Sequence, residues 1–245
     1  MVNILICGAG GKMGATLSEL LADDTQAKAI CGVDIHAPEN ARMPIYKTFG
    51  EVRQKVDVII DFSSPAVLKD ELEWAVKNNV PVVLGSTGFD DKQLKYIDDC
   101  SKKVAIFKTA NFSLGINLLM KLVREASLAL GDKFDIEIIE MHHSLKADAP
   151  SGTALMLAES ANVENKDYVY GRDKSSAKRG KEIGSHAVRG GTIVGEHEIM
   201  FAGEDEIVTF SHSARSKKVF AAGAIKAAKF LAGKPAGKYD MQDII

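Results

Sequence analysis

The sequence predicts an α/β protein, with a doubly wound parallel sheet in its first part and a second α+β domain that has a mixed or antiparallel sheet. Two observations support this division. Over roughly the first hundred residues, apolar runs typical of buried strands alternate with segments of helical periodicity. After residue 112 this alternation stops, and a long helical pattern is followed by strand-like segments with polar turns.

Five strands and three helices are predicted in the first part. In the first helix, for example, Leu17, Leu20 and Leu21 recur at the spacing of one helical face. Strands joined by helices in this order form right-handed βαβ units, and such units build a parallel sheet. The predicted strands lie at 2–7, 27–33, 56–62, 80–85 and 104–107, and the helices at 12–22, 66–77 and 90–101.

The second part is predicted to contain both helices and strands around a long loop. The segment 165–191 is polar, basic and glycine-rich, so we expect it to be a long, mobile loop, with the basic group 178–181 solvated. An alanine-rich helix at 219–231 is expected to return to the first part, because its small side chains allow close helix–sheet contact. The other predicted elements are helices at 114–130 and 154–159 and strands at 135–141, 192–201 and 206–211.

Composition and charge argue against several classes of protein. The 31 Lys and Arg residues nearly balance the 33 Asp and Glu residues, and a net charge of −2 gives no reason to expect nucleic acid or an anionic membrane as a partner. Cys7, Cys31 and Cys100 form no CxxC pair, which argues against a disulfide framework and for a reducing compartment. The N-terminus lacks a signal-peptide pattern and no apolar run reaches the roughly 18 residues that span a bilayer, so we expect a cytoplasmic protein.

A glycine-rich turn joins the first predicted strand to the first predicted helix. Glycines allow the backbone to turn tightly and to approach a pyrophosphate at the helix N-terminus. Asp34 ends the second strand, twenty residues after Gly14, where a carboxylate can accept hydrogen bonds from an adenosine ribose. This combination indicates a Rossmann-type dinucleotide-binding domain; the alternative is a tight turn followed by an unrelated aspartate. The turn fits GxxGxxG rather than strict GxGxxG and consists of Gly8, Ala9, Gly10, Gly11, Lys12, Met13 and Gly14.

Asp34 also bears on which dinucleotide is bound. Its carboxylate repels a 2′-phosphate, and Ile35 and His36 supply no arginine to receive one. We therefore expect NADH to be preferred and NADPH to be tolerated at best. Two later strand ends should face the same crevice, although either could be turn chemistry alone. They comprise Gly85, Ser86 and Thr87, and Thr109, Ala110, Asn111 and Phe112.

A short polar stretch in the second part carries residues suited to acid–base chemistry. His142 belongs to the residue type that most often transfers protons near neutral pH, and Lys146 could supply a proton or bind an anion. Gly152 and Thr153 begin a helix whose first amides can bind a carboxylate. His142 and His143 are strand neighbours that point to opposite faces, and the other histidines are scattered, so no metal site is expected. The alternative is a surface loop with incidental histidines.

The stretch from His142 to Ala154 closely resembles the signature of the 4-hydroxy-tetrahydrodipicolinate reductase family, also called the dihydrodipicolinate reductase family. The resemblance extends in order to the motifs at 8–14, 85–89, 110–113 and 195–197. It implies an NAD(P)H-dependent oxidoreductase of lysine and diaminopimelate biosynthesis that acts on a small dicarboxylate and forms a homotetramer. It also implies roles for individual residues: His142 as proton donor and acceptor, Lys146 as proton donor, and His143, Gly152 and Thr153 as ligands of the substrate carboxylates.

The resemblance also implies how the work is divided between the two domains. Residues 1–112, completed by 216–245, would bind the cofactor, and residues 113–215 would bind the substrate and make the oligomer contacts. The chain departs from the family's usual pattern at Asp34-Ile35, where relatives often carry Glu-Arg, and at Lys217, where relatives commonly carry Arg. The first departure weakens the case for NADPH.

Two rival functions are compatible with parts of the sequence. A short-chain dehydrogenase needs Tyr-x-x-x-Lys on a helix; Tyr170 and Lys174 match the spacing but lie in a glycine-rich, charged segment. A non-catalytic nucleotide-sensing module would need the cofactor fold but neither His142 nor Lys146. Substrate-dependent oxidation of NADH distinguishes the reductase from both.

Overall fold

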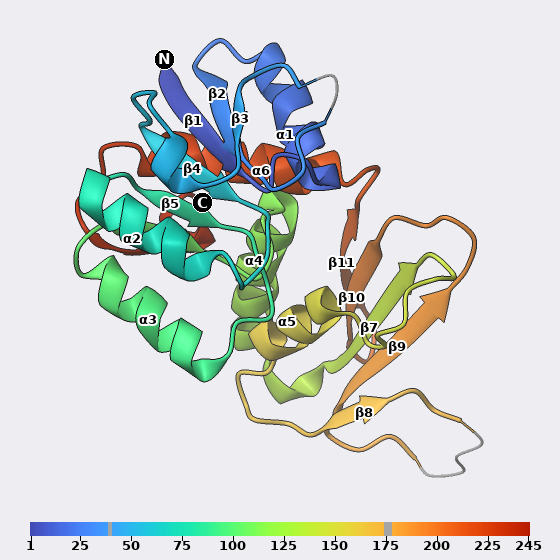
Figure 1. Cartoon of the computed structure of the whole chain (residues 1–245). Coiled ribbons are helices and arrows are strands. Elements are labelled where there is room, and N and C mark those ends of the chain that lie inside the picture. Colours follow the sequence, from blue (N-terminus) through green and yellow to red (C-terminus); the bar gives the residue numbers. More distant parts are fainter. Residues whose placement is uncertain (39–40, 174–177) are drawn as a thin grey trace. The chain divides into compact units, whose positions relative to one another are not determined.

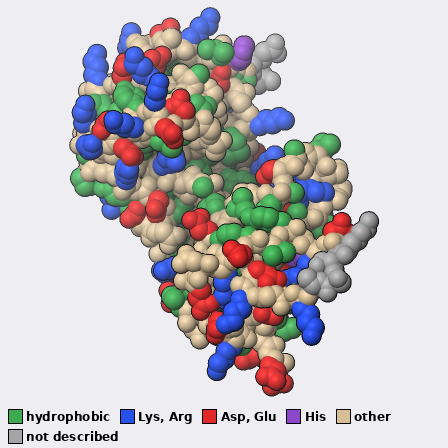
Figure 2. Space-filling view, turned by 90° about the horizontal axis from the view of Figure 1, so that it is seen from below, with side chains coloured by type: hydrophobic (Ala, Val, Ile, Leu, Met, Phe, Trp, Pro, Cys, Tyr) green, Lys and Arg blue, Asp and Glu red, His purple; other side chains and the backbone are tan. Residues whose placement is uncertain are grey.

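The computed structural model describes residues 1–38, 41–173 and 178–245, which divide into two compact units. The first unit comprises Met1–Ser113 and Lys218–Ile245, and the second comprises Leu114–Lys217. Among the described residues, none of the helices combines the length and the apolar character needed to cross a membrane. On the face drawn in Figure 2, basic and acidic side chains are interspersed, as expected for a net charge of −2.

The first unit is built on a seven-stranded parallel sheet (Figure 1). Its strand order is β12-β6-β5-β4-β1-β2-β3, so the chain starts in the interior of the sheet and its final strand pairs at an edge. β1 (Val2–Cys7) pairs with β2 on one side and β4 on the other, and its last four residues are buried. The other strands are β2 (Ala27–Val33), β3 (Ile45–Tyr46), β4 (Val58–Asp61), β5 (Val82–Leu84), β6 (Ala105–Lys108) and β12 (Gly237–Tyr239).

Helices cover both faces of this sheet. α2 (Leu68–Asn78) and α3 (Asp91–Ser101) pack on one face, where Leu72 and Ile97 join a core shared with the strands. α1 (Lys12–Ala22) and α6 (Lys218–Leu231) contact each other, and α6 also contacts β4, β5 and β6. The predicted doubly wound sheet is therefore confirmed, and the alanine-rich helix from the end of the chain packs on it. Single-turn 3₁₀ helices lie at Phe49–Glu51 and Met241–Asp243 in this unit and at Gly131–Lys133 in the second.

The second unit contains a five-stranded mixed sheet in the order β11-β10-β7-β9-β8. β10 is antiparallel to both its neighbours, whereas β7–β9 and β9–β8 pair in parallel. α4 (Leu114–Leu130) and α5 (Gly152–Ala161) share one apolar core with the sheet, which includes Val123 and Leu157. The strands are β7 (Asp135–His142), β8 (Tyr168–Tyr170), β9 (Ile183–Arg189), β10 (Glu196–Ala202) and β11 (Ile207–Ser213).

The prediction of a long loop at 165–191 is wrong, because this segment contributes β8 and β9 to the sheet. Gly184, which suggests a loop, lies inside β9, where the carboxylate of Glu137 on the neighbouring strand occupies the space above it: a Cβ atom there would lie 1.8 Å from Oε2 of Glu137. The basic group at 178–181 is not simply solvated either. Arg179 donates hydrogen bonds to Oε1 of Glu137 at 3.0 Å, to Oδ1 of Asp135 at 2.7 Å and to backbone carbonyls of Ile136 and Glu182.

Candidate active site

The glycine turn between β1 and α1 is packed so closely that side chains would not fit. Gly8 has a φ of +80°, a conformation that favours glycine. A Cβ atom at Gly14 would lie 2.4 Å from the carbonyl oxygen of Gly8, and one at Gly10 would lie 2.2 Å from that of His36. The turn therefore exposes backbone where a pyrophosphate could approach the start of α1, as the dinucleotide motif requires.

Asp34 lies at the carboxyl end of β2, next to this turn. Its Oδ2 accepts a hydrogen bond from Gly10 N at 2.8 Å, and its Oδ1 accepts one from His36 N at 2.9 Å, so the carboxylate is held in place. A cavity of about 350 Å³ opens here at the ends of β1, β2 and β4. It is lined in part by Gly8, Gly11, Asp34, His36, Lys47 and Ser63. This is the crevice where parallel α/β sheets bind nucleotides, and its residues fit a dinucleotide.

The other two predicted cofactor segments follow β5 and β6 and do not line that cavity. A Cβ atom at Gly85 would lie 2.5 Å from the Phe62 ring, so the glycine permits close packing there. Thr109 donates a hydrogen bond from Oγ1 to the Asn111 carbonyl at 3.0 Å, and the buried Phe112 ring lies 5.6 Å from that of Phe62. These contacts give both segments a structural role, and their contact with a cofactor stays a prediction.

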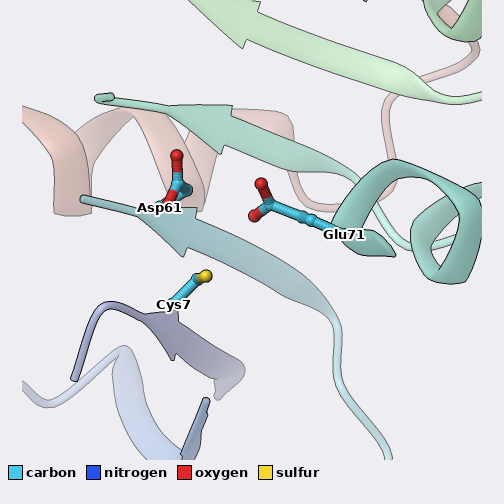
Figure 3. Close-up of side chains that lie close together, drawn as sticks. All are labelled: Cys7, Asp61 and Glu71. Atoms are coloured by element: carbon cyan, nitrogen blue, oxygen red, sulfur yellow. The ribbon is translucent and has the colours of Figure 1, made fainter. Parts of the chain in front are cut away.

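A buried polar cluster lies in the first unit, where β1, β4 and α2 meet (Figure 3). It consists of Cys7 at the end of β1, Asp61 at the end of β4 and Glu71 on α2, and one ligand-type atom from each lies within 4.8 Å of the others. Ser63 supports Asp61, whose Oδ1 accepts hydrogen bonds from Ser63 N at 2.8 Å and Ser63 Oγ at 2.5 Å. Neither carboxylate oxygen of Glu71 has a hydrogen-bond partner among the described residues. Burial, followed by the charge of Asp61, raises the pKa of Glu71 well above its ordinary value, so the neutral form is favoured.

Glu71 should therefore make stability depend on pH. In the unfolded chain it ionises near its ordinary pKa of 4.5, whereas the folded chain retains its proton to a higher pH. The folded state then loses stability as pH rises above that value, at about 1.4 kcal/mol per pH unit until the folded-state pKa is passed. Replacing Glu71 with glutamine should raise the Tm at about pH 8, by about 2–4 °C for each kcal/mol recovered. The gain should shrink towards zero at about pH 4.5, which thermal unfolding at several pH values would measure.

Glu73→Gln is the matched control, because Glu73 lies on the same helix with its side chain 58% exposed. Its effect on stability should stay within about 0.5 kcal/mol at either pH. A Glu71→Gln protein that melts below the wild type at about pH 8 would contradict this account of the cluster.

His142 is the last residue of β7 and is buried on the face that packs against α5. Its Nδ1 lies 2.6 Å from Oε2 of Glu140, two residues earlier on the same face. Its Nε2 faces the backbone of Gly195, where an added Cβ would lie 3.1 Å away. The ring of His197 meets it edge-on, with centroids 5.1 Å apart. Burial and then the proximity of His142 lower the pKa of His197 to about 4, so His197 is neutral near pH 7.

Lys146 and His143 follow in the loop between β7 and α5. Nζ of Lys146 lies 2.8 Å from Oδ1 of Asp148, and the side chain is 22% exposed. The backbone amide of Lys146 donates to the carbonyl of His143 at 3.1 Å, which holds the turn. Nδ1 of His143 is buried and has no hydrogen-bond partner among the described residues.

Gly152 and Thr153 form the first turn of α5, as predicted. Ser151 is the N-cap, and its Oγ accepts a hydrogen bond from Ala154 N at 3.2 Å. The first amides of a helix have no partner within the helix and can bind an anion. The second unit thus places a buried imidazole, a lysine and a helix N-terminus on consecutive segments of chain.

Sequence reasoning assigned no role to three residues around His142: Glu140, Arg189 and His197, the last of which belongs to the motif at 195–197. Arg189, at the end of β9, donates from Nη1 to Oε2 of Glu140 at 2.8 Å and from Nη2 to Oε1 at 2.6 Å. The alternation of strand residues could have indicated Glu140, since residues 140 and 142 share a face. Arg189 could not have been found in this way, because it lies in the segment that we predicted to be a loop.

The short-chain dehydrogenase pair does not form as that family requires. Tyr170 is the last residue of β8, a strand rather than a helix. Lys174 lies outside the described residues.

Comparison with known proteins identifies the family. Residues 2–112 match the family described as dihydrodipicolinate reductase, N-terminus, and residues 115–245 match the one described as dihydrodipicolinate reductase, C-terminus. The 4-hydroxy-tetrahydrodipicolinate reductase of Caldanaerobacter subterraneus subsp. tengcongensis is 46% identical, over 100% of this chain and 98% of that protein. The enzyme of the same name from Clostridium tetani is 42% identical, over 98% of this chain and 96% of that protein.

A solved structure agrees with the sequence matches. Dihydrodipicolinate reductase from Paenisporosarcina sp. TG-14, bound to dipicolinate, superposes with a TM-score of 0.84 at 25% identity, covering 100% of both chains. The likeness spans both units, the parallel sheet and the mixed sheet alike. The chain therefore belongs to the dihydrodipicolinate reductase family.

Proposed function

We propose that this protein reduces 4-hydroxy-tetrahydrodipicolinate to tetrahydrodipicolinate, with loss of water and at the expense of NAD(P)H, in the biosynthesis of lysine and diaminopimelate. Its family membership supports this activity, and the dipicolinate bound to the Paenisporosarcina reductase supports a small cyclic dicarboxylate as substrate. The observation that carries the proposal is the grouping of a buried His142, Lys146 and the N-terminus of α5 beside one strand end.

In this proposal the second unit binds the substrate and transfers protons to and from it. His143 and the first amides of α5, at Gly152 and Thr153, bind the carboxylates. When bound, the nicotinamide supplies a hydride to C4 of the cyclic imine that remains after the 4-hydroxyl leaves as water. The resulting enamine-like anion takes up one proton, which Lys146 donates with the help of His142. One substrate, one NAD(P)H and one proton thus give one product, one NAD(P)⁺ and one water.

A coupled assay tests this activity. Pyruvate, aspartate semialdehyde and the upstream synthase generate the substrate in place, and NADH absorbance follows its reduction. We expect oxidation that depends on every component, including this protein. Background oxidation alone would sink the reductase proposal and favour a nucleotide-sensing module.

We also propose the division of labour implied by the resemblance: the first unit binds the cofactor, and the second binds the substrate and joins the copies of a homotetramer. The outer face of the mixed sheet supports the latter. Ile139, Met141 and Met200 lie on that face, only partly buried, and Ile207 at the edge of the sheet is 62% exposed. Apolar side chains on an otherwise uncovered sheet face fit contact with a second copy of the chain.

For the cofactor, we propose that NADH is preferred and NADPH tolerated. Asp34 places a fixed negative charge beside the adenosine end of the cavity, while Lys47 on the same lining offers a compensating charge. Replacing Asp34 with asparagine removes the repulsion of a 2′-phosphate. It should shift the ratio of kcat/KM values towards NADPH by about tenfold, which corresponds to about 1.4 kcal/mol. Steady-state kinetics with both cofactors measure this ratio.

Asp23→Asn is the control, because Asp23 is an exposed residue at the end of α1 that does not line the cavity. It should leave the cofactor ratio unchanged. A wild-type protein that strongly prefers NADPH would overturn this account of Asp34.

A further inference from the structure

Glu140 is a fully buried carboxylate to which the proposed reaction gives no role. It lies on β7, on the face that also carries Ile136, Ile138 and His142. Burying an ionised carboxylate costs several kcal/mol unless partners compensate for the lost water. A fully buried charge beside the expected proton donor therefore calls for a specific function or a specific set of partners.

Four hydrogen-bonding contacts surround the Glu140 carboxylate. Arg189 donates to both oxygens, at 2.8 and 2.6 Å, in a bidentate pair. Ser151 N donates to Oε1 at 2.9 Å, and His142 Nδ1 lies 2.6 Å from Oε2. Burial acts to raise the pKa of Glu140, but the hydrogen bonds from Arg189, His142 and Ser151 outweigh it and hold the pKa below its ordinary value. Glu140 is thus ionised at neutral pH.

An ionised carboxylate only accepts hydrogen bonds, so it selects one form of the neutral His142 ring. The ring hydrogen must reside on Nδ1, where it points at Glu140. The lone pair is then on Nε2, the nitrogen that faces Gly195, where an added Cβ would lie 3.1 Å away and crowd the ring. Nε2 is therefore the atom of His142 through which protons can be exchanged with a substrate.

The other groups near His142 do not compete for Glu140. His197 is neutral near pH 7, and its Nε2 lies 3.2 Å from Ser151 Oγ. Lys146 pairs with Asp148, at 2.8 Å, rather than with Glu140. Both side chains thus have partners other than Glu140.

The same carboxylate also holds the start of α5. Its Oε1 accepts from the backbone of Ser151, the N-cap that precedes Gly152 and Thr153. One buried group therefore fixes both the expected proton-transfer ring and the helix end expected to bind a substrate carboxylate. Arg189 keeps that group ionised and in place.

We propose that Glu140, held by Arg189, is a positioning residue of the reaction: it fixes the tautomer of His142 and aligns its Nε2 with the carboxylate-binding end of α5. This inference rests on the proposed function for its catalytic consequence. The part that concerns structure, the tautomer of His142, can be measured without an activity assay.

The first measurement uses the full-length wild-type protein labelled with ¹⁵N-histidine. In the NMR spectrum of the neutral ring, His142 should carry its hydrogen on Nδ1. A His142 that carries it on Nε2 would overturn the proposal, whatever the activity of the protein. If the tautomer is as expected but NADH oxidation never depends on substrate, the proposed function fails while the assignment of Glu140 to His142 stands.

The second measurement uses Glu140→Gln, whose amide group can donate to Nδ1 and so favours the hydrogen on Nε2. The His142 signals should change to that tautomer, and kcat should fall by about 10²–10⁴-fold, the usual contribution of a positioned proton-transfer group. The same change of carboxylate to amide in a Ser-His-Asp triad costs about 10⁴-fold. The KM for NADH should stay within about threefold, because the variant leaves the glycine turn untouched. A variant with the tautomer switched but kcat within about threefold of the wild type would contradict the positioning role.

Glu137→Gln is the matched control. Glu137 lies on the opposite face of the same strand, with its Oε2 2.9 Å from Nε2 of His186, and so loses an equivalent carboxylate–imidazole pair. Its His142 signals and kcat should match the wild type. If Glu137→Gln lost as much kcat as Glu140→Gln, loss of any carboxylate–imidazole pair on β7 would lower kcat by disturbing the fold. That result would refute the specific role of Glu140.

Discussion

Replacing Lys146 with alanine should lower kcat by about 10²–10⁴-fold and leave NADH binding almost unchanged. Lys146 follows the strand that ends in His142, and its ammonium group is kept near the surface of the second unit by Asp148 at 2.8 Å. In the proposed reaction it supplies the proton that completes the reduction, so its loss should affect turnover rather than cofactor affinity. Stopped-flow binding of NADH and steady-state kcat separate the two effects.

Changing His142 to glutamine should lower kcat within the same range, and the double variant should lose little more than the worse of the two single variants. Groups that act on one proton behave as a unit, so their effects do not add. Lys181→Ala serves as a control, because Lys181 forms a similar ion pair with Asp132, at 2.5 Å, elsewhere in the second unit. Near-normal kcat in both Lys146→Ala and His142→Gln would refute the assigned roles.

Replacing Gly223 with alanine should destabilise the first unit strongly. Gly223 lies on α6, and an added Cβ would lie 1.8 Å from the carbonyl oxygen of Phe112. That backbone has little room to give, because the Phe112 ring packs between Phe62 and Phe107. Overpacking typically costs about 1–3 kcal/mol, and a clash with backbone belongs at the upper end; a loss of about 3 kcal/mol should lower the Tm by roughly 6–12 °C. Differential scanning calorimetry measures the loss.

Gly50→Ala is the control for this experiment, since its Cβ would find its nearest neighbour, Oγ1 of Thr48, at 3.8 Å. Its Tm should move by no more than about 2 °C. A Gly223→Ala protein with the same Tm as the wild type would show that α6 does not pack closely against the segment at 109–112. The prediction matters for function because this contact supports a segment that we expect to bind the cofactor.

Local patterns predicted the first unit well, because its signals are short-range. The apolar run at Val2–Cys7, the glycines after it and Asp34 at the end of the next strand each reveal their role through immediate neighbours. Short edge strands escaped prediction: β3 and β12 have two and three residues, too few to show a period. Their positions depend on pairing partners that the local sequence does not specify.

The second unit shows where local reasoning fails. Gly184 and the charges around Arg179 have the composition of a loop. They nevertheless lie in β9 or just before it, because β9 pairs with β7, more than forty residues earlier, where Arg179 also finds Glu137. For the same reason Arg189 could not be assigned to Glu140, its partner 49 residues away. His142, Lys146 and the start of α5 were identified because they lie within one short stretch.

Glu71 is an intermediate case. On α2 it occupies the same buried face as Leu68, Leu72 and Ala75, so helical spacing alone places a carboxylate where an apolar residue is expected. The pattern could have marked it as unusual. Its neighbours Cys7 and Asp61 come from two strands, however, and only the fold brings the three together.

The central claim is that this chain reduces C4 of its substrate with a hydride from a nicotinamide cofactor. The most direct measurement supplies the product of the upstream synthase with NADH that carries deuterium at the transferable position, followed by mass spectrometry and NMR of the product. We expect tetrahydrodipicolinate with one deuterium, at C4. Unlabelled product, or NADH oxidation without any tetrahydrodipicolinate, would contradict it.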